Sequence, residues 1–276
     1  MFESIKLHTD GDMTGNSDQI ECVRTNTSVA IPIEVFERRY LAPQLPKADW
    51  YKRLGNPTPL GLVGFLMGAT PLACTLMGWG GIWRGWRSNN VDINGLKRGF
   101  TYFFGGVLQL IASLLEFILG NTFPFIVFGS FGAFWVGFGA AQTPSFNAQG
   151  FFQSGQDGTD ISEFYASYAF GLIFMAFLVA IYTICATRLN VVFVCLFFTL
   201  TIALICLAVS YWYIARGNDV VGGRLSKTGG ALTFVVCFLA WYYLIGLMLD
   251  AVNFPLRVPV GDLTGRFARE KTSSEA

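Results

Sequence analysis

The sequence predicts an all-α membrane protein whose six transmembrane helices form three helical hairpins around a central pore. Of its 276 residues, 53% are hydrophobic and 13% are charged, whereas a soluble domain carries roughly 25% charged residues. The hydrophobic residues gather into six blocks of about 20 residues, the length of helix that crosses a hydrocarbon core about 30 Å thick. Aromatic residues flank several blocks, as is typical of helix ends in the headgroup layer.

The six blocks define the expected helices, and almost no charged residue falls inside them. In chain order, they are residues 59–81, 100–119, 122–142, 164–186, 191–211 and 230–250. The linkers after the first, third and fifth helices are long, and the other two are short. An even number of spans places both termini on one side of the membrane. A small excess of Lys and Arg on that side favours cytoplasmic termini.

Two polar segments enclose the expected membrane domain. Residues 1–45 lack the apolar core of a signal peptide and are rich in Ser, Thr, Asp, Asn and Gly, which predicts a disordered cytoplasmic tail. Residues 46–255 form the expected six-helix domain. Residues 256–276 form a C-terminal tail.

A weak internal repeat supports the three hairpins, because each odd-numbered helix begins with an Asn that can cap it. Two of these helices also have Pro in the first turn, where the missing N–H group costs little. Unpaired N–H groups at three converging helix starts favour an anion, so we expect the starts to lie on a substrate path. The residues concerned are Asn56, Pro57, Pro59, Asn121, Thr122 and Asn190.

Each odd-numbered helix carries a bulky apolar residue nine or ten positions beyond its Asn, namely Phe65, Phe131 and Leu200. That spacing corresponds to about 14 Å of helix, or half the membrane. If the three helices surround an axis, these side chains meet at the midplane as an apolar constriction. Ordinary helix packing explains the pattern equally well.

Glu116 is the most informative ionisable residue, because it lies inside the second expected helix with no basic residue three or four positions away. An acidic side chain deep in a span costs about 2.5–3.5 kcal/mol. Glu116 is either a protonatable or gating group, or a structural group hydrogen-bonded to Asn121 or Thr122. Other polar residues in or near the spans suit hydrogen bonds between helices, with pore lining as the alternative. These are Gln109, Ser113, Ser130, Gln142, Thr199 and Thr201.

The residues exclude several classes of protein. His8 is the only histidine, the cysteines lack metal-ligand spacing, and no phosphate-binding loop occurs. The sequence therefore predicts no enzyme activity, no metal site and no cofactor. A net charge of +1 gives nucleic acid no electrostatic reason to bind.

The first helix begins with Asn-Pro-Thr-Pro-Leu-Gly-Leu at residues 56–62. This closely resembles the Asn-Pro-Ala-Pro-Leu-Gly-Leu signature of the acetate uptake transporter family, the bacterial acetate/succinate permeases and their fungal relatives. Further matches occur in the family's order and spacing. They are Gly105-Gly106-x-x-Gln109, Leu114-Leu115-Glu116, Gly120-Asn121-Thr122-Phe123, Ser130-Phe131-Gly132-x-Phe134-Trp135 and Phe198-Thr199-Leu200-Thr201.

The resemblance implies a homo-oligomer, a hexamer with a pore through each subunit, that passes acetate and related short-chain monocarboxylates, in some members succinate. It also implies that Phe65 and Leu200 belong to an apolar constriction in which Phe131 stands where Tyr is usual. The missing hydroxyl group makes that constriction drier. The long polar N-terminal tail resembles fungal members, which implies the plasma membrane.

The leading hypothesis is a plasma-membrane permease or channel for acetate and similar acids, linked to protons through Glu116. Its partners are then the acid, protons, the lipid bilayer and further copies of the chain. Two alternatives stay open, both suggested for relatives. One is a membrane sensor or regulator of acetate adaptation, and the other is an exporter of ammonia or ammonium.

Overall fold

The computed structural model describes most of the chain beyond residue 53, together with a few isolated positions. The described residues are 24–25, 28–29, 54–79, 99–153, 160–256, 258–259, 261 and 263. The chain divides into two units, Met1–Leu54 and Gly55–Ala276. Each unit is described by itself.

In the first unit, the described residues form one short antiparallel pair of strands. β1 (Arg24–Thr25) pairs with β2 (Ser28–Val29), and Arg24 lies opposite Val29. The rest of the predicted tail at residues 1–45 lies outside the described residues. Its disorder stays a prediction.

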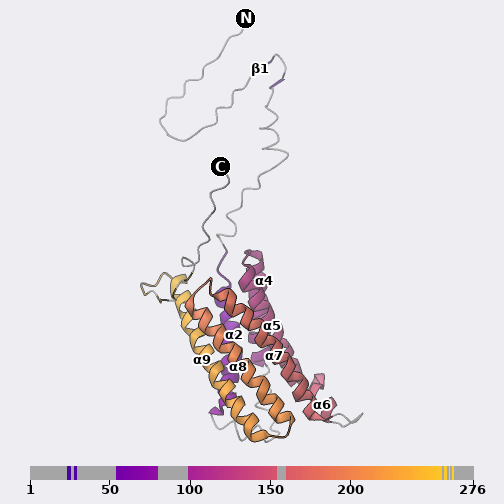
Figure 1. Ribbon diagram of the computed structural model, residues 1–276. Coiled ribbons are helices and arrows are strands. Elements are labelled where there is room, and N and C mark those ends of the chain that lie inside the picture. Colours follow the sequence, from indigo (N-terminus) through magenta and orange to yellow (C-terminus); the bar gives the residue numbers. More distant parts are fainter. Residues whose placement is uncertain are drawn as a thin grey trace, which may run out of the picture. The chain divides into compact units, whose positions relative to one another are not determined.

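The second unit contains six helices that are long and apolar enough to cross a membrane (Figure 1). They are α2 (Thr58–Met77), η4 (Phe100–Leu108) continued by α4 (Gln109–Ile118), α5 (Thr122–Gln142), α7 (Ile161–Ala186), α8 (Val191–Ala215) and α9 (Asp219–Ala251). Two short helices, η5 (Pro144–Phe146) and α6 (Ala148–Gln153), lie between α5 and α7. The predicted all-α membrane fold is therefore confirmed, and the first five spans agree to within a few residues.

The predicted start of the sixth helix is wrong. We expected this helix to begin at residue 230, whereas α9 begins at Asp219. The Asn218 side chain caps it by accepting a hydrogen bond from the Val221 N–H group at 3.2 Å. The hydropathy of the sequence marks only the apolar part of a helix. The 11 residues before the predicted start, 219–229, add about 16 Å to the helix. The linker from α8 is consequently short.

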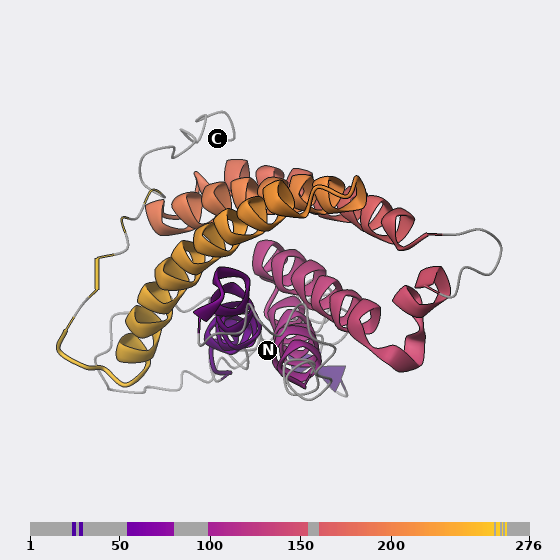
Figure 2. The ribbon, with the colours of Figure 1, turned by 90° about the horizontal axis from the view of Figure 1, so that it is seen from below.

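The six helices form two groups. η4 and α4 pack on both α2 and α5, whereas α7 packs on α8 and α8 packs on α9; α2 also packs on α9 and joins the groups. Figure 2 shows α7, α8 and α9 as a curved layer opposite α2, α4 and α5. α5 contacts the group of α7, α8 and α9 through aromatic rings. The ring centroids of Phe131 and Tyr182 lie 6.5 Å apart, and those of Phe123 and Phe197 lie 6.2 Å apart.

Small residues let α2 approach η4 closely. A Cβ atom added at Gly68 would lie 3.2 Å from the Gly105 Cα atom, and one at Gly64 would lie 2.8 Å from the Phe104 carbonyl oxygen. In lipid, such close packing replaces apolar burial as a driving force for helix association. It fixes α2 against the start of the second span.

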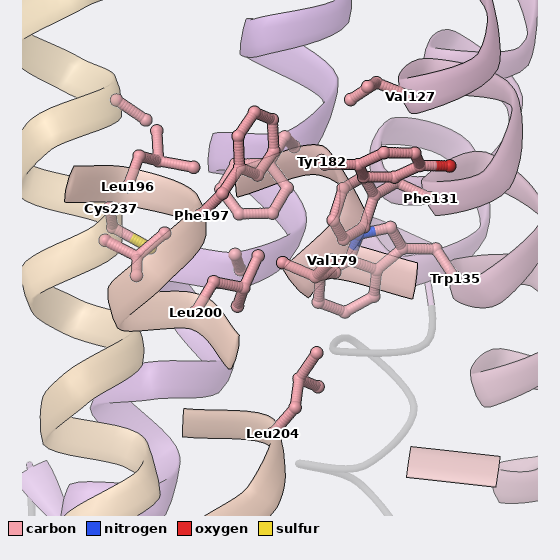
Figure 3. Close-up of a cluster of buried hydrophobic side chains, with 14 of the residues drawn as sticks. Val127, Phe131, Trp135, Val179, Tyr182, Leu196, Phe197, Leu200, Leu204 and Cys237 are labelled. Carbon is pink, nitrogen blue, oxygen red and sulfur yellow. The ribbon is translucent and has the colours of Figure 1, made fainter. Parts of the chain in front are cut away.

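The buried centre of the unit is apolar. Figure 3 shows side chains from α5 and α8 directed toward the same space, among them Phe131, Trp135, Leu200 and Leu204. Each of these four is at most 6% exposed. This centre is where the candidate pathway lies.

Candidate transport pathway

Two cavities lie in the centre of the second unit. The larger has a volume of about 370 Å³, and Thr58, Phe123 and Asn190 are among its lining residues. Because these residues belong to the beginnings of α2, α5 and α8, we call it the start-side cavity. The smaller, of about 70 Å³, is lined by residues nearer the other ends of these helices, such as Leu76 and Phe138. We call it the far-side cavity.

The two cavities share three lining residues, Phe65, Phe131 and Leu200. The Phe65 and Phe131 rings meet edge to face with centroids 5.7 Å apart. All three side chains are buried, with exposed fractions of 5–8%. The structure thus brings together, from three different helices, the residues that the sequence analysis assigned to a constriction, and places them between two cavities.

The helix starts are arranged only partly as expected. The Asn56 Oδ1 atom accepts a hydrogen bond from the Thr58 N–H group at 3.0 Å, and Asn190 Oδ1 accepts one from the Phe193 N–H group at 2.8 Å. Asn190 is the N-cap of α8 as predicted, whereas the capping roles predicted for Asn56 and Asn121 are wrong: the N-cap of α2 is Pro57, and the Asn121 side chain makes no cap hydrogen bond. It turns to a buried carboxylate on the preceding helix.

Five of the predicted path residues lie at the starts of α2 and α5. Pro57 is buried and Pro59 is half-buried, whereas the other three, Asn56, Asn121 and Thr122, are exposed. The cavity wall itself is formed by their neighbours, since Thr58 and Pro124 line the start-side cavity. A role of the five predicted residues in the substrate path stays a prediction.

Glu116 is that buried carboxylate, with none of its surface exposed. The Thr58 hydroxyl group donates to Oε1 at 2.5 Å, and Asn121 Nδ2 donates to Oε2 at 2.7 Å. These bonds tie the start of α2 to the turn between α4 and α5. The expected hydrogen bond to Asn121 is present, and Thr58 takes the place that we considered for Thr122. Glu116 therefore reaches the start-side cavity through Thr58.

Ser113 and Ser130 make the contacts between helices that we expected, whereas the Thr201 hydroxyl group donates to the Phe197 carbonyl oxygen of its own helix at 2.9 Å. Ser113 Oγ donates to the Phe125 carbonyl oxygen at 2.8 Å, which joins α4 to α5. The Ser130 and Tyr182 hydroxyl oxygens lie 2.9 Å apart and join α5 to α7. Tyr182 is therefore near Phe131 but uses its hydroxyl group elsewhere, so it does not replace the hydroxyl that Phe131 lacks.

Two buried polar side chains have no hydrogen-bond partner among the described residues. They are Gln109, at both Nε2 and Oε1, and Trp135, at Nε1. Gln109 lines the start-side cavity and Trp135 lines the far-side cavity. Sequence reasoning named Gln109 as one of several polar residues in spans and as part of a motif of the family resemblance, but assigned it no role in binding. Gln109 and Glu116 lie seven residues apart on one face of the second span. Only the structure shows that the Glu116 oxygens have hydrogen-bond partners and that the Gln109 polar atoms have none among the described residues.

The C-terminal segment reaches the turn between α7 and α8 beside the start-side cavity, which the sequence did not indicate. The Val191 N–H group donates to the Gly261 carbonyl oxygen at 3.0 Å, and the Leu263 N–H group donates to the Leu189 carbonyl oxygen at 2.9 Å. Leu189 lines the cavity. The segment thus holds the turn between α7 and α8 in place.

Comparisons with known proteins agree with this architecture. The model of the GPR1/FUN34/yaaH family matches residues 39–265. The chain belongs to this family. Protein alcS of Aspergillus fumigatus is 44% identical over 86% of both chains. Acetate permease A of Emericella nidulans is 31% identical over 84% of this chain and 76% of its own length. Ammonia transport outward protein 2 of Saccharomyces cerevisiae is 31% identical over 73% of this chain and 64% of its own.

The fold is that of a solved channel. The structure of the bacterial acetate channel SatP matches with a TM-score of 0.56 and 24% identity, covering 75% of this chain and 99% of that chain. At this identity, the match shows the fold alone. Together with the six apolar helices, family membership makes the chain a multi-pass membrane protein of a transporter family and confirms the prediction that it is not an enzyme.

Proposed function

We propose that the chain is a permease for acetate and related short-chain monocarboxylates. The observation that carries the proposal is the position of Phe65, Phe131 and Leu200 between two cavities that share no other lining residue. Relatives named as an acetate permease and an acetate channel supply the substrate class. The start-side cavity, at about 370 Å³, has room for such an acid with water, because one water needs only about 10–15 Å³.

The acid enters between the starts of α2, α5 and α8 and sheds water in the start-side cavity. It then passes Phe65, Phe131 and Leu200 toward the far side. Removing water from a carboxyl group without a replacement partner is costly. The constriction is therefore a barrier and a filter for size, and the binding site lies in the cavity before it.

The further features of the proposal rest on the family resemblance. The permease resides in the plasma membrane with cytoplasmic termini and assembles as a homo-oligomer, a hexamer with one path per subunit. Transport is linked to protons. Glu116 acts at the cavity wall through Thr58, which donates to it at 2.5 Å. The protonation of the Glu116 carboxyl group is thereby coupled to the part of the path that Thr58 lines.

Enlarging the constriction tests the proposal. In proteoliposomes with purified protein, Leu200→Ala raises the ratio of lactate to acetate uptake, because the larger acid gains most from the removed side chain. The matched control is Leu244→Ala in α9, since Leu244 is also 5% exposed but lines neither cavity. An unchanged ratio in both Leu200→Ala and Phe65→Ala contradicts the constriction.

Ammonia transport is the second candidate, and the yeast relative named for outward ammonia transport favours it. Labelled methylammonium decides between the two substrates. Methylammonium flux that acetate does not inhibit supports ammonia export, whereas acetate flux that methylammonium does not inhibit supports the acid permease. A sensor is distinguished by deleting residues 1–45, since a transporter keeps its flux in vesicles without them.

A further inference from the structure

Gln109 is a buried carboxamide whose two polar atoms both remain without a partner in the described structure. None of its surface is exposed, yet it forms part of the wall of the start-side cavity. Leaving a buried donor or acceptor unsatisfied costs about 1–3 kcal/mol per group. A permanent cost of this kind points to a ligand that satisfies the group when it binds.

The other polar groups around this cavity are already engaged. The Thr58 hydroxyl group donates to Glu116 at 2.5 Å. Asn190 Oδ1 accepts from the Phe193 N–H group, and the Asn190 side chain also hydrogen-bonds the Tyr243 hydroxyl group. Gln109 is therefore the polar side chain with unused capacity in the described cavity wall.

The cavity wall offers no positively charged side chain to an anion, since none of the described residues that line it is Lys, Arg or His. At the starts of α2 and α8, the Thr58 and Phe193 N–H groups are already bonded to Asn56 and Asn190. Thr58 in the wall donates to the acidic Glu116. Burying a carboxylate without a cation is very costly. One amide N–H₂ group supplies donors for a carboxylate, but the Oε1 atom beside it would face the second carboxylate oxygen and repel it.

A neutral carboxylic acid fits the same carboxamide without conflict. Its carbonyl oxygen accepts from Gln109 Nε2, and its O–H group donates to Gln109 Oε1, so both unpaired atoms are satisfied at once. The Gln109 side chain is held for this contact by close packing, because a Cβ atom added at Gly64 would lie 2.9 Å from the Gln109 Cγ atom. Donor and acceptor are thus presented together at the cavity wall.

We propose that Gln109 is the binding site for the protonated form of the acid, which crosses the constriction as a neutral molecule with its own proton. This rests on the proposed function and deepens it. One acid and one proton then move together and no net charge crosses the membrane. The proton link of the proposed function is kept, but the acid carries the proton in place of Glu116, which then serves to hold Thr58 in the cavity wall.

Competition in proteoliposomes tests the proposal with the purified full-length chain. Acetamide is neutral and presents a donor and an acceptor as acetic acid does, whereas methanesulfonate is a permanent anion of similar size. The uptake measured is that of labelled acetate after the uptake by protein-free liposomes is subtracted. We expect acetamide to inhibit this uptake and methanesulfonate not to inhibit it. Inhibition by methanesulfonate, or none by acetamide, overturns the proposal.

The Gln109→Leu variant links this result to the residue. Replacing two unsatisfied polar atoms with apolar ones leaves the thermal stability unchanged or higher, while acetate uptake and inhibition by acetamide both fall about tenfold through the loss of two hydrogen bonds. Ser113→Ala, one turn along α4, leaves both unchanged. If Gln109→Leu unfolds at a lower temperature or keeps full inhibition by acetamide, Gln109 is merely structural and the proposal is wrong.

Failure of the proposed function is distinguishable from failure of this inference. If the wild-type chain gives no acetate uptake above protein-free liposomes, the permease proposal fails. Acetamide entry, followed by light scattering as the vesicles swell, then tests Gln109 on its own. Entry that Gln109→Leu abolishes still supports a site for neutral carboxyl-like ligands, and entry that Gln109→Leu leaves intact overturns it.

Discussion

The start-side and far-side cavities differ in size and in the polar groups they offer. The first measures about 370 Å³ and contains the unpaired donor and acceptor of Gln109, whereas the second measures about 70 Å³ and contains the single unpaired N–H group of Trp135. The far-side cavity is also lined by the hydroxyl-bearing Tyr168, Tyr211 and Thr233, so its small volume sets it apart more than its polarity does. Side chains beyond the constriction must move to let the ligand pass, and we therefore place a second barrier on the far side.

Loss of the Glu116 carboxyl group has the largest expected effect, because it removes the two hydrogen bonds that tie the start of α2 to the turn between α4 and α5. Glu116→Ala leaves the Thr58 hydroxyl group without its acceptor, at a cost of about 1–3 kcal/mol, and also removes the bond to Asn121. We expect a clearly lower unfolding temperature in detergent and loss of transport. Glu116→Gln keeps one acceptor oxygen, so we expect a smaller fall in its unfolding temperature than in that of Glu116→Ala. Equal stability of Glu116→Ala and the wild type would show that these two bonds do not hold the start of α2.

Enlarging the far-side cavity has the next largest effect and acts in the opposite direction. Leu204 lines that cavity and not the other. We expect Leu204→Ala to speed acetate uptake about fivefold, equivalent to about 1 kcal/mol of barrier. Leu244→Ala serves again as the buried control. If uptake by Leu204→Ala is unchanged in initial-rate measurements, no second barrier lies on the far side.

Trp135→Phe tests the smaller polar contribution of the far-side cavity. The ring volume is largely kept, and no hydrogen bond within the described structure is lost because Trp135 Nε1 has no partner. Stability therefore stays the same, while acetate uptake falls about threefold if the passing acid uses this donor. An unchanged rate would assign the N–H group no part in transport.

Gly261→Ala has the smallest expected effect, beside the start-side cavity. Gly261 has a φ angle of +64°, and an added Cβ atom would lie 3.1 Å from the Val191 Cγ2 atom, so Ala there costs about 1–2 kcal/mol. We expect faster protease cleavage of the C-terminal segment with a change in uptake of less than about twofold. Gly55→Ala, which has no neighbour within 4 Å, leaves cleavage unchanged.

The sequence predicted the fold well because hydrophobic blocks record the thickness of the membrane directly. The three residues proposed for the constriction were singled out by their distance from the helix starts, and the structure places all three in the lining of both cavities. Where polar residues continue a helix beyond the hydrocarbon, hydropathy carries no signal. The start of α9 at Asp219 was missed for this reason.

The hydrogen bonds of the site could not be predicted with the same success. Asn121 has the position of a cap but bonds Glu116 instead, because a buried carboxylate attracts a donor more strongly than a helix start attracts an acceptor. The roles of Gln109 and of the C-terminal segment depend on which groups lack or find a partner across the fold. That information is absent from the spacing of residues along one helix.

The most direct test of the account is labelled acetate uptake by proteoliposomes that contain the wild-type chain or Leu200→Trp. A path between Phe65, Phe131 and Leu200 predicts uptake well above protein-free liposomes for the wild type and none for Leu200→Trp, whereas Leu244→Trp keeps part of it. If Leu200→Trp is correctly folded and transports acetate as fast as the wild type, the acid takes another route and the central claim is wrong.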